Sequence, residues 1–387
     1  MKIKNLNIVG VGGLKQLTLD FDDQMNLICG PNGIGKTTIL ECIAHMFGDS
    51  QTQVLKRNVS SEHGSINIIV NHDGIDINRE TIFNKFDPRE KNYIRGISDL
   101  SNKLLSFKIT RSFNYKSLDS VGRDTEKTVA KYKAEPILGI KIGDMKNWFV
   151  NRYLYSKHEG ALTKEQLDNF DFAQSCFSLL DENYRFSKVE ASSNEIMVQT
   201  PAGEIYYEYL SSGFKSIISI VFGIIKEIEF RFIEPRILAR DFDGVVLIDE
   251  LELHLHPSWQ EKIAGILTTA FPLAQFIAST HSPHVIQFSL PNQIIALELD
   301  SKTVVERELP SSKYGYQGWT IEEILKDVMA MTDLRTDIFN NYLEIFQNKI
   351  EQEDYTGALD IHNEIDKLLH PNNQLRKLLK FQLAKIK

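Results

Sequence analysis

Short apolar sets separated by turn residues occupy the first thirty positions of the chain. Glycines interrupt the first gap between these sets, and Asp22-Asp23 interrupts the second. Short apolar runs bounded by Gly or Asp are typical of β-strands, so this stretch predicts three strands. Residues 65–70 and 75–77, around Asp73-Gly74, predict a β-hairpin. The apolar positions of the first three strands are Ile3, Leu6, Ile8, Leu17, Leu19, Phe21, Met25, Leu27 and Ile28.

A different spacing, with apolar residues three and four positions apart, marks the predicted helices. Residues 38–47 follow this spacing up to Gly48, and residues 216–228 follow it again. The apolar run at 245–248 and the mostly apolar stretch at 274–278 are short enough to be strands buried on both faces, as in parallel sheets. This combination of elements predicts an α/β fold.

The last 70 residues are predicted to be mostly helical, because apolar residues such as Ile338, Tyr342, Ile345 and Phe346 lie at helical spacing. The aromatic residues Phe339, Tyr342 and Phe346 lie at helical spacing, and we expect them to pack against a neighbouring helix. Residues 320–329 and 337–387 carry apolar stripes that a small domain cannot cover by itself, and such stripes need a partner surface. We therefore expect this region to assemble the protein with itself and with a second protein.

Between residues 82 and 193, the helical and strand periodicities of apolar residues weaken. Residues 85–135 contain 12 Lys or Arg against 7 Asp or Glu, although the whole chain carries a net charge of −8. A basic excess of this kind is most often a solvated surface, with DNA contact as the alternative. We expect a split head from 1–80 and 195–310, an inserted helical, basic lid at 81–194, and a C-terminal helical region at 311–387.

Composition bounds the class of protein without identifying it. The chain has 387 residues, 42% of them hydrophobic, which is enough for a sizeable core. Three cysteines form no C-x-x-C pair and indicate reduced thiols. The longest apolar run, at 217–225, is too short to cross a bilayer, and the N-terminus has no signal-peptide pattern. A cytoplasmic protein is therefore expected.

The strongest chemical signal is the stretch GPNGIGKT from Gly30 to Thr37. It matches G-x-x-x-x-G-K-[ST], with a predicted strand before it and a predicted helix after it. Glycines allow backbone N–H groups to surround phosphate oxygens, and the helix N-terminus favours negative charge. Lys36 would neutralise the β- and γ-phosphates, and the Thr37 hydroxyl would bind Mg²⁺. The predicted ATP-binding residues of this stretch are Gly30, Asn32, Gly33, Gly35, Lys36, Thr37 and Thr38.

Two further strands end in polar residues. The run GVVLIDE places Asp249 and Glu250 at the carboxyl end of a buried strand, where ligands bind in open α/β sheets. Asp249 would hold Mg²⁺, and Glu250 would activate the attacking water. His281 follows the next strand and could reach a γ-phosphate. ATP and Mg²⁺ are thus the predicted cofactors, and Glu250 and His281 the predicted catalytic residues.

The segment LSSGFKS, from Leu210 to Ser216, opens the predicted helix at 216–228. Ser and Gly at a helix N-terminus can donate N–H groups to a phosphate. Ser211 or Ser212 would equally serve as an ordinary N-cap of any helix. By itself, the segment leaves these two interpretations open.

Together, the four motifs resemble those of the ABC-type ATPase superfamily, in its SMC/RecF-like branch. The resemblance implies that two heads dimerise around two ATP molecules, so that Ser211 and Gly213 contact the nucleotide held by the other head. Phe214 stands where transporters usually have Gln or Glu, which disfavours a transporter motor. The glutamine loop of the family is not placed by its sequence, and Gln51 and Gln53 are candidates only because they follow the first helix.

The segment DELELHLHP, from Asp249 to Pro257, narrows this resemblance. It is similar to the overcoming-lysogenization-defect ATPases and to ATPases of bacterial antiphage systems, including the Septu ATPase subunit and PARIS. The later YGYQGWTIEEILKDVMAM and the helical tail also resemble Septu-type and retron-associated ATPases. The resemblance implies an ATP-driven sensor or scaffold in antiphage defence. It also implies a separate effector, a nuclease of the HNH type, and we expect that effector in another chain because this sequence has no evident nuclease centre.

Some of the same residues also fit other classes of site. His254, His256, His281 and His284 with Asp249 could form a metal cluster, but the first pair is explained more simply by a turn facing a partner head. Ser279 or Ser282 beside His281 could suggest a serine hydrolase, but the sequence lacks the G-x-S-x-G elbow of that class. The alternative function that stays open is a DNA-repair ATPase of the RecF or SMC type.

Overall fold

The computed structural model describes residues 1–110, 115, 117–124, 127–310, 312–331 and 334–387, without the side chain of Asp49. The basic segment at 85–135 therefore lies partly outside the described residues. The chain divides into two compact units, Met1–Ala330 and Met331–Lys387, each described by itself. Among the residues described, no helix is long and apolar enough to span a membrane.

A six-stranded sheet forms the centre of the first unit. Its strand order is β15-β14-β3-β13-β12-β8; the five strands from β14 to β8 run parallel, and β15 pairs antiparallel with β14. The parallel order brings the carboxyl ends of β3, β12 and β13 to one edge. The strands are β3 (Met25–Cys29), β8 (Leu104–Phe107), β12 (Val245–Ile248), β13 (Gln275–Ser279), β14 (Ile294–Asp300) and β15 (Thr303–Glu306).

Alternation along these strands divides the interior into two apolar cores. Val246 and Ile248 of β12 belong to one core, and Val245 and Leu247 belong to the other. Successive side chains of a strand point to opposite faces of the sheet, so a strand covered on both faces is apolar throughout. The predicted buried strands at 245–248 and 274–278 are confirmed as β12 and β13.

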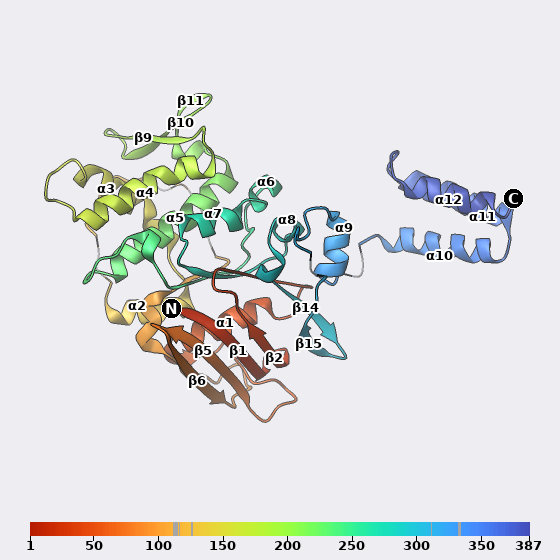
Figure 1. Ribbon diagram of the computed structural model, residues 1–387, viewed down its shortest axis with the longest axis horizontal. Helices are drawn as coiled ribbons and strands as arrows, with labels where there is room; N and C mark the ends of the chain where they lie inside the picture. Colours follow the sequence, from red (N-terminus) through yellow and green to blue (C-terminus); the bar gives the residue numbers. More distant parts are fainter. Residues whose placement is uncertain (111–114, 116, 125–126, 311, 332–333) are drawn as a thin grey trace. The chain divides into compact units, whose positions relative to one another are not determined.

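One face of the central sheet is covered by helix α1 and a second, antiparallel sheet (Figure 1). That sheet has the order β2-β1-β5-β6, and its β5–β6 hairpin turns at Asp73, confirming the predicted hairpin. The first three predicted strands and the helix after them are also confirmed. The bounds are β1 (Lys2–Val11), β2 (Leu14–Asp20), β5 (Gly64–His72), β6 (Ile75–Phe83) and α1 (Lys36–Met46), beside the small pair β4 (Asp49–Thr52) and β7 (Asn92–Arg95).

The opposite face carries α3, α4, α5 and α7 (Figure 1). Its core includes Trp148, Phe149 and Phe177, which lie in the stretch expected to be an inserted lid. Strand β8 of that stretch is a member of the central sheet. The helices are α2 (Val129–Leu138), α3 (Met145–Tyr155), α4 (Lys164–Leu180), α5 (Ser212–Arg231), α6 (Pro257–Gln260), α7 (Ile263–Ala270), α8 (Pro283–Gln287) and α9 (Ile321–Glu323). A three-stranded sheet contains β9 (Arg185–Glu190), β10 (Glu195–Thr200) and β11 (Gly203–Tyr206).

The second unit consists of α10 (Asp337–Glu351), α11 (Tyr355–Leu368) and α12 (Leu375–Ala384). Phe339 and Phe346 of α10 are buried in its core, with Tyr342 packed against them, as expected for aromatic residues facing a neighbouring helix. Residues 312–330 belong to the first unit, although the C-terminal region was expected to begin at residue 311. The predicted head, lid and C-terminal assembly region stay a proposal.

Candidate functional site

The phosphate loop joins β3 to α1 at the carboxyl edge of the central sheet. β3 ends at Cys29 and α1 begins at Lys36. Gly30, Gly33 and Gly35 have φ values of 140°, 75° and 109°, which a residue with a Cβ adopts only with strain. Gly30 also lies so close to β14 that a Cβ would meet the carbonyl oxygen of Leu297 at 2.5 Å. The motif therefore forms a tight glycine turn in front of a helix N-terminus.

The Lys36 side chain lies within this turn. It is 5% exposed, and its Nζ donates to the carbonyl oxygens of Gly30 at 2.8 Å and Pro31 at 2.9 Å. Burial lowers the pKa of Lys36, while the nearby carboxylates of Glu252 and Asp249 raise it. The sequence thus places a cation where backbone N–H groups and a helix dipole already favour an anion.

Thr37 and Asp249 meet across the loop. Thr37 Oγ1 donates to Asp249 Oδ1 at 3.2 Å, although the two residues are 212 positions apart. Asp249 follows β12 and is 4% exposed, and its Oδ1 also accepts from Ser279 Oγ at 2.6 Å. A hydroxyl and a carboxylate side by side form the kind of oxygen donor set that Mg²⁺ prefers. These two residues fit a magnesium ion bound beside a phosphate.

Glu250 adopts a left-handed backbone conformation immediately after Asp249. Its φ is 51°, which is uncommon for a residue with a side chain and typical of functional sites. Ser279 of β13 holds this conformation, because its Oγ accepts from the N–H of Glu250 at 2.8 Å. Its carbonyl oxygen accepts from the N–H of Leu251 at 2.9 Å. The acidic pair therefore lies at the start of a turn that is hydrogen-bonded to the end of β13.

His281 lies two residues beyond β13, beside the acidic turn. Its backbone N–H donates to Glu252 Oε1 at 2.5 Å. Partial burial and then the positive charge of Lys36 lower the pKa of His281, whereas Glu252, Glu250 and Asp249 raise it. The phosphate loop, the acidic pair and His281 are therefore brought together at one edge of the sheet.

Ser211 and Gly213 open α5. Ser211 is the N-cap, and its hydroxyl oxygen accepts from the N–H of Phe214 at 3.2 Å. Gly213 is buried beneath Trp259, and a Cβ added there would meet Trp259 Cδ1 at 2.9 Å. The interpretation of Ser211 as an N-cap is thus confirmed, and the residue is exposed.

Phe214 points inward from the start of α5. It is 2% exposed and packs against Tyr184, with ring centroids 4.9 Å apart, and against Trp259, with centroids 5.5 Å apart. Two residues later, Ser216 Oγ donates to the carbonyl oxygen of Leu253 at 3.2 Å. The helix that carries Ser211 is therefore attached to the turn that follows the acidic pair.

Other residues singled out in the sequence lie elsewhere. Gln51 and Gln53 are exposed at the β4–β7 pair, so the glutamine loop is still not placed. His254 and His256 are exposed in the turn after β12. Across the described ranges, no three His, Cys, Asp or Glu side chains are grouped as metal ligands.

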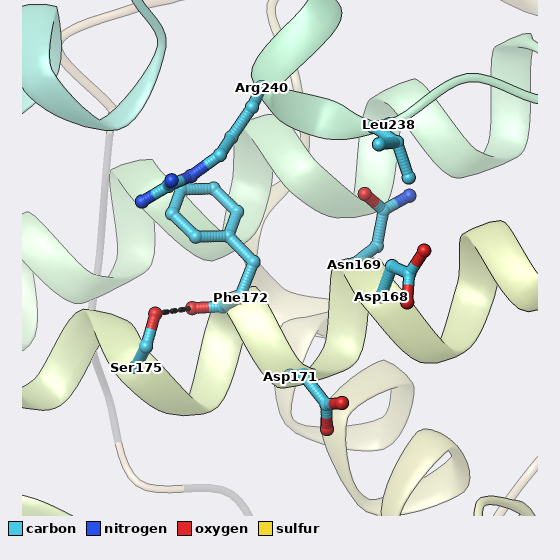
Figure 2. Close-up of a pocket in the computed structure, with 7 residues that line it drawn as sticks. All are labelled: Asp168, Asn169, Asp171, Phe172, Ser175, Leu238 and Arg240. Atoms are coloured by element: carbon cyan, nitrogen blue, oxygen red, sulfur yellow. Dashed lines mark hydrogen bonds between the residues drawn. The ribbon is translucent and has the colours of Figure 1, made fainter.

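A cavity of about 330 Å³ lies between α4 and the segment before β12. Figure 2 shows Asn169 and Phe172 of α4 beside it, with the Arg240 guanidinium 4.5 Å from the Phe172 ring centroid. Asn169 Oδ1 accepts from the N–H of Ala239 at 2.7 Å. No residue predicted from the motifs lines this cavity, so it is distinct from the phosphate loop.

Three residues of the site were not predicted from the sequence. The sequence suggests Ser279 only as a hydrolase nucleophile, and it gives no role to Glu252 or Trp259. Ser279 contacts Asp249, and Glu252 contacts His281, because β12 and β13 are neighbours in the sheet. Trp259, which belongs to α6, contacts Gly213. The sequence feature that could have indicated these residues is the polar run after each of the two apolar strands. Neighbouring parallel strands end at the same edge of a sheet, so their polar ends lie close together.

The fold and the assembled motifs define an ABC-type P-loop ATPase with an α/β head and a C-terminal helical region. A family profile described as "AAA domain" matches residues 1–198. A second, "AAA domain, putative AbiEii toxin, Type IV TA system", matches residues 164–287. The expected P-loop α/β class is thereby confirmed.

A full-length relative identifies the family. The chain is 44% identical to the Septu protein PtuA of Bacillus thuringiensis over 386 residues, covering 99% of this chain and 98% of the relative. The chain therefore belongs to the Septu PtuA family, which confirms the resemblance noted in the sequence. It is also 21% identical to the Escherichia coli protein named Retron Ec83 probable ATPase, covering all of this chain and 87% of that protein. A PtuA of Bacillus mycoides is 26% identical over 95% of this chain and 50% of its own length.

Among solved structures, the chain is similar to the SMC head domain of Thermotoga maritima. The TM-score is 0.48 and the identity 15%, over 80% of this chain and all of that one.

Proposed function

We propose that the protein binds ATP with Mg²⁺, hydrolyses it, and uses this cycle to control a separate effector in antiphage defence. The observation that carries the nucleotide site is the contact of Thr37 Oγ1 with Asp249 Oδ1 at 3.2 Å, beside the buried ammonium group of Lys36. A phosphate-loop hydroxyl, a carboxylate and a cation within one small region are suited to a magnesium–triphosphate ligand.

The phosphate loop supplies the binding energy for the triphosphate. Its glycines and the N-terminus of α1 direct N–H groups toward the β-phosphate, and Lys36 neutralises charge as water leaves. Thr37 and Asp249 would hold Mg²⁺ directly or through water. The bound ion would neutralise charge on the β- and γ-phosphate oxygens. Ser279 keeps the Asp249 carboxylate oriented by donating to Oδ1.

Glu250 is proposed to orient and deprotonate the attacking water. Its left-handed conformation turns its backbone away from the strand direction, and Ser279 holds that conformation. His281 is proposed to contact the γ-phosphate, where a neutral or protonated imidazole can donate a hydrogen bond. The lowered pKa of His281 favours the neutral form in the absence of a phosphate.

We further propose that two heads close around the nucleotides. Ser211 is exposed at the N-terminus of a 20-residue helix, which gives it access to a second head. In this arrangement, Ser211 and the N–H of Gly213 contact the γ-phosphate held by the other head. The γ-phosphate then links ATP occupancy to the geometry of the dimer, which acts as a two-state element.

The effector is proposed to be a second protein. The sequence carries ATPase motifs without a recognised nuclease centre, and the family relationship to Septu and retron ATPases supports a defence role. The test uses the purified full-length chain with Mg²⁺, ATP and plasmid DNA. We expect weak ATP hydrolysis and intact plasmid. Metal-dependent cleavage that is lost on mutating this chain would contradict a separate effector, and DNA-stimulated hydrolysis would favour the DNA-repair alternative.

A further inference from the structure

The Glu252 carboxylate joins the turn after β12 to the turn after β13. Its Oε2 accepts from the hydroxyl of Thr280 at 2.7 Å. Its Oε1 accepts from the backbone N–H of His281 at 2.5 Å. Both carboxylate oxygens are therefore occupied by adjacent residues of the other turn. Hydrogen bonds to a charged carboxylate are shorter and stronger than those between neutral groups.

Thr280 extends this connection to the phosphate loop. It is fully buried, and its N–H donates to the carbonyl oxygen of Ile28 in β3 at 3.0 Å. Its hydroxyl oxygen also accepts from the N–H of Ser282 at 3.1 Å, so Thr280 is fixed on both sides. Glu252 thus binds a rigid point that belongs to the same edge as the loop.

We propose that Glu252 is a positioning residue for ATP hydrolysis, which fixes the backbone of His281 relative to Glu250. This inference rests on the proposed ATPase function. Glu250 and Glu252 share one tight turn, in which the N–H of Leu253 donates to the carbonyl oxygen of Glu250 at 2.9 Å. Glu252 therefore transmits the position of the proposed base to the residue proposed to contact the γ-phosphate. It acts through His281 and touches no reacting atom.

Two substitutions separate this role from general stability. Glu252→Ala removes both acceptors. Glu252→Gln keeps the shape and one acceptor oxygen, but its NH₂ group faces one of two donors. We expect both variants to bind ATP with unchanged Kd and to lower kcat, by about 10- to 100-fold for Ala, since small misplacements near a reaction centre have effects of this size. Glu182→Ala, an exposed glutamate on the surface of the first unit, is the matched control.

A double-mutant cycle with His281→Ala gives the decisive kinetic result. If Glu252 acts through His281, the loss of kcat caused by Glu252→Ala largely disappears when His281 is already Ala. An equal loss in both backgrounds, or kcat unchanged in Glu252→Ala, would overturn the inference. Absence of hydrolysis in the unmodified chain would instead contradict the proposed function.

A spectroscopic measurement is independent of hydrolysis. The chain has 10 histidines, so selective ¹⁵N-histidine labelling gives few amide signals, and His281→Gln assigns the relevant one. We expect the His281 amide proton of the unmodified chain to lie downfield and to exchange slowly. In Glu252→Gln or Glu252→Ala it should move upfield and exchange faster, while Glu182→Ala leaves it unchanged. A His281 amide that is insensitive to both Glu252 variants would refute the contact on which the inference depends.

Discussion

Phe214 and Trp259 pack edge to face, with ring centroids 5.5 Å apart and ring planes at 90°. Phe214 belongs to the first turn of α5, directly after Gly213, and Trp259 belongs to α6 in the segment that follows the acidic pair. The same indole covers Gly213, leaving no space for a Cβ. The start of α5 and the region beyond Glu250 are therefore packed as one piece.

Phe214→Ala should lower the free energy of unfolding by about 3–5 kcal/mol, since it removes a large side chain that is 2% exposed. All three tryptophans lie in the first unit, so urea unfolding followed by tryptophan fluorescence reports on that unit. Phe86→Ala, 47% exposed and beside Arg57, should change stability by about 1 kcal/mol or less. Equal effects of the two substitutions would mean that Phe214 has no special packing role.

The motif residues were predictable because each follows an apolar strand or opens a helix, and these patterns are local. The contacts of Ser279 and Glu252 were not, since they depend on β12 and β13 being neighbours in the sheet. The contribution of α3 to the core was hidden for a different reason. Arg152 is 1% exposed there and pairs with the buried Glu229 at 2.6 Å, so polar residues break the apolar spacing.

Helix α10 shows that the spacing of apolar residues does not determine which of two adjacent residues is buried. Ile338 fitted the helical spacing, yet it is 62% exposed, whereas its neighbour Phe339 is buried. Only one of these two adjacent apolar side chains can face the core, and in the structure it is the phenyl ring of Phe339. Which of two adjacent apolar residues faces the core is decided by tertiary packing, so periodicity alone predicted the helix and not its exact face.

Lys36→Ala should abolish ATP binding. The buried ammonium group is the cation nearest the proposed triphosphate, and its loss leaves phosphate charge uncompensated in a partly dry site. Binding is measured with a fluorescent ATP analogue. Lys91→Ala, an exposed lysine, should bind normally. Normal affinity in a folded Lys36→Ala protein would remove Lys36 from the site.

Glu250→Gln should separate binding from hydrolysis. The substitution keeps the shape of the side chain but removes the charge that orients water, so kcat should fall by about 10²-fold or more while ATP still binds. Steady-state phosphate release and an ATP-dependent shift in sedimentation measure the two effects. We expect a closed dimer to accumulate with ATP. Unchanged turnover would assign the base to another residue, with His281 the first to test.

Mixing inactive variants should restore activity if the site is shared between heads. Lys36→Ala lacks nucleotide binding, and Ser211→Arg blocks the exposed N-cap position of α5 that would face the other head. A mixed dimer has one site with an intact phosphate loop and an intact Ser211. Its phosphate release should exceed that of either variant alone. Activity no higher than the parents would argue against a shared site, or would require both sites to hydrolyse together.

The second unit should be required for assembly and dispensable for nucleotide binding. Its core residues Phe339, Phe346 and Leu379 belong to α10–α12 alone, and the chain divides into compact units between Ala330 and Met331. Leu378 and Phe381 of α12 are 54% and 71% exposed, an apolar face that a further protein surface would cover.

Deletion of residues 331–387 should therefore leave the Kd for ATP unchanged and reduce the mass of the complex measured by light scattering. Leu378→Ser with Phe381→Ser should reduce assembly in the full-length chain, because these substitutions remove exposed apolar area without emptying the core of the unit. Leu379→Ser, which disrupts that core, is the comparison that separates loss of the surface from loss of the fold. If the truncated chain keeps its full assembly and still associates with the effector, the second unit has no docking role.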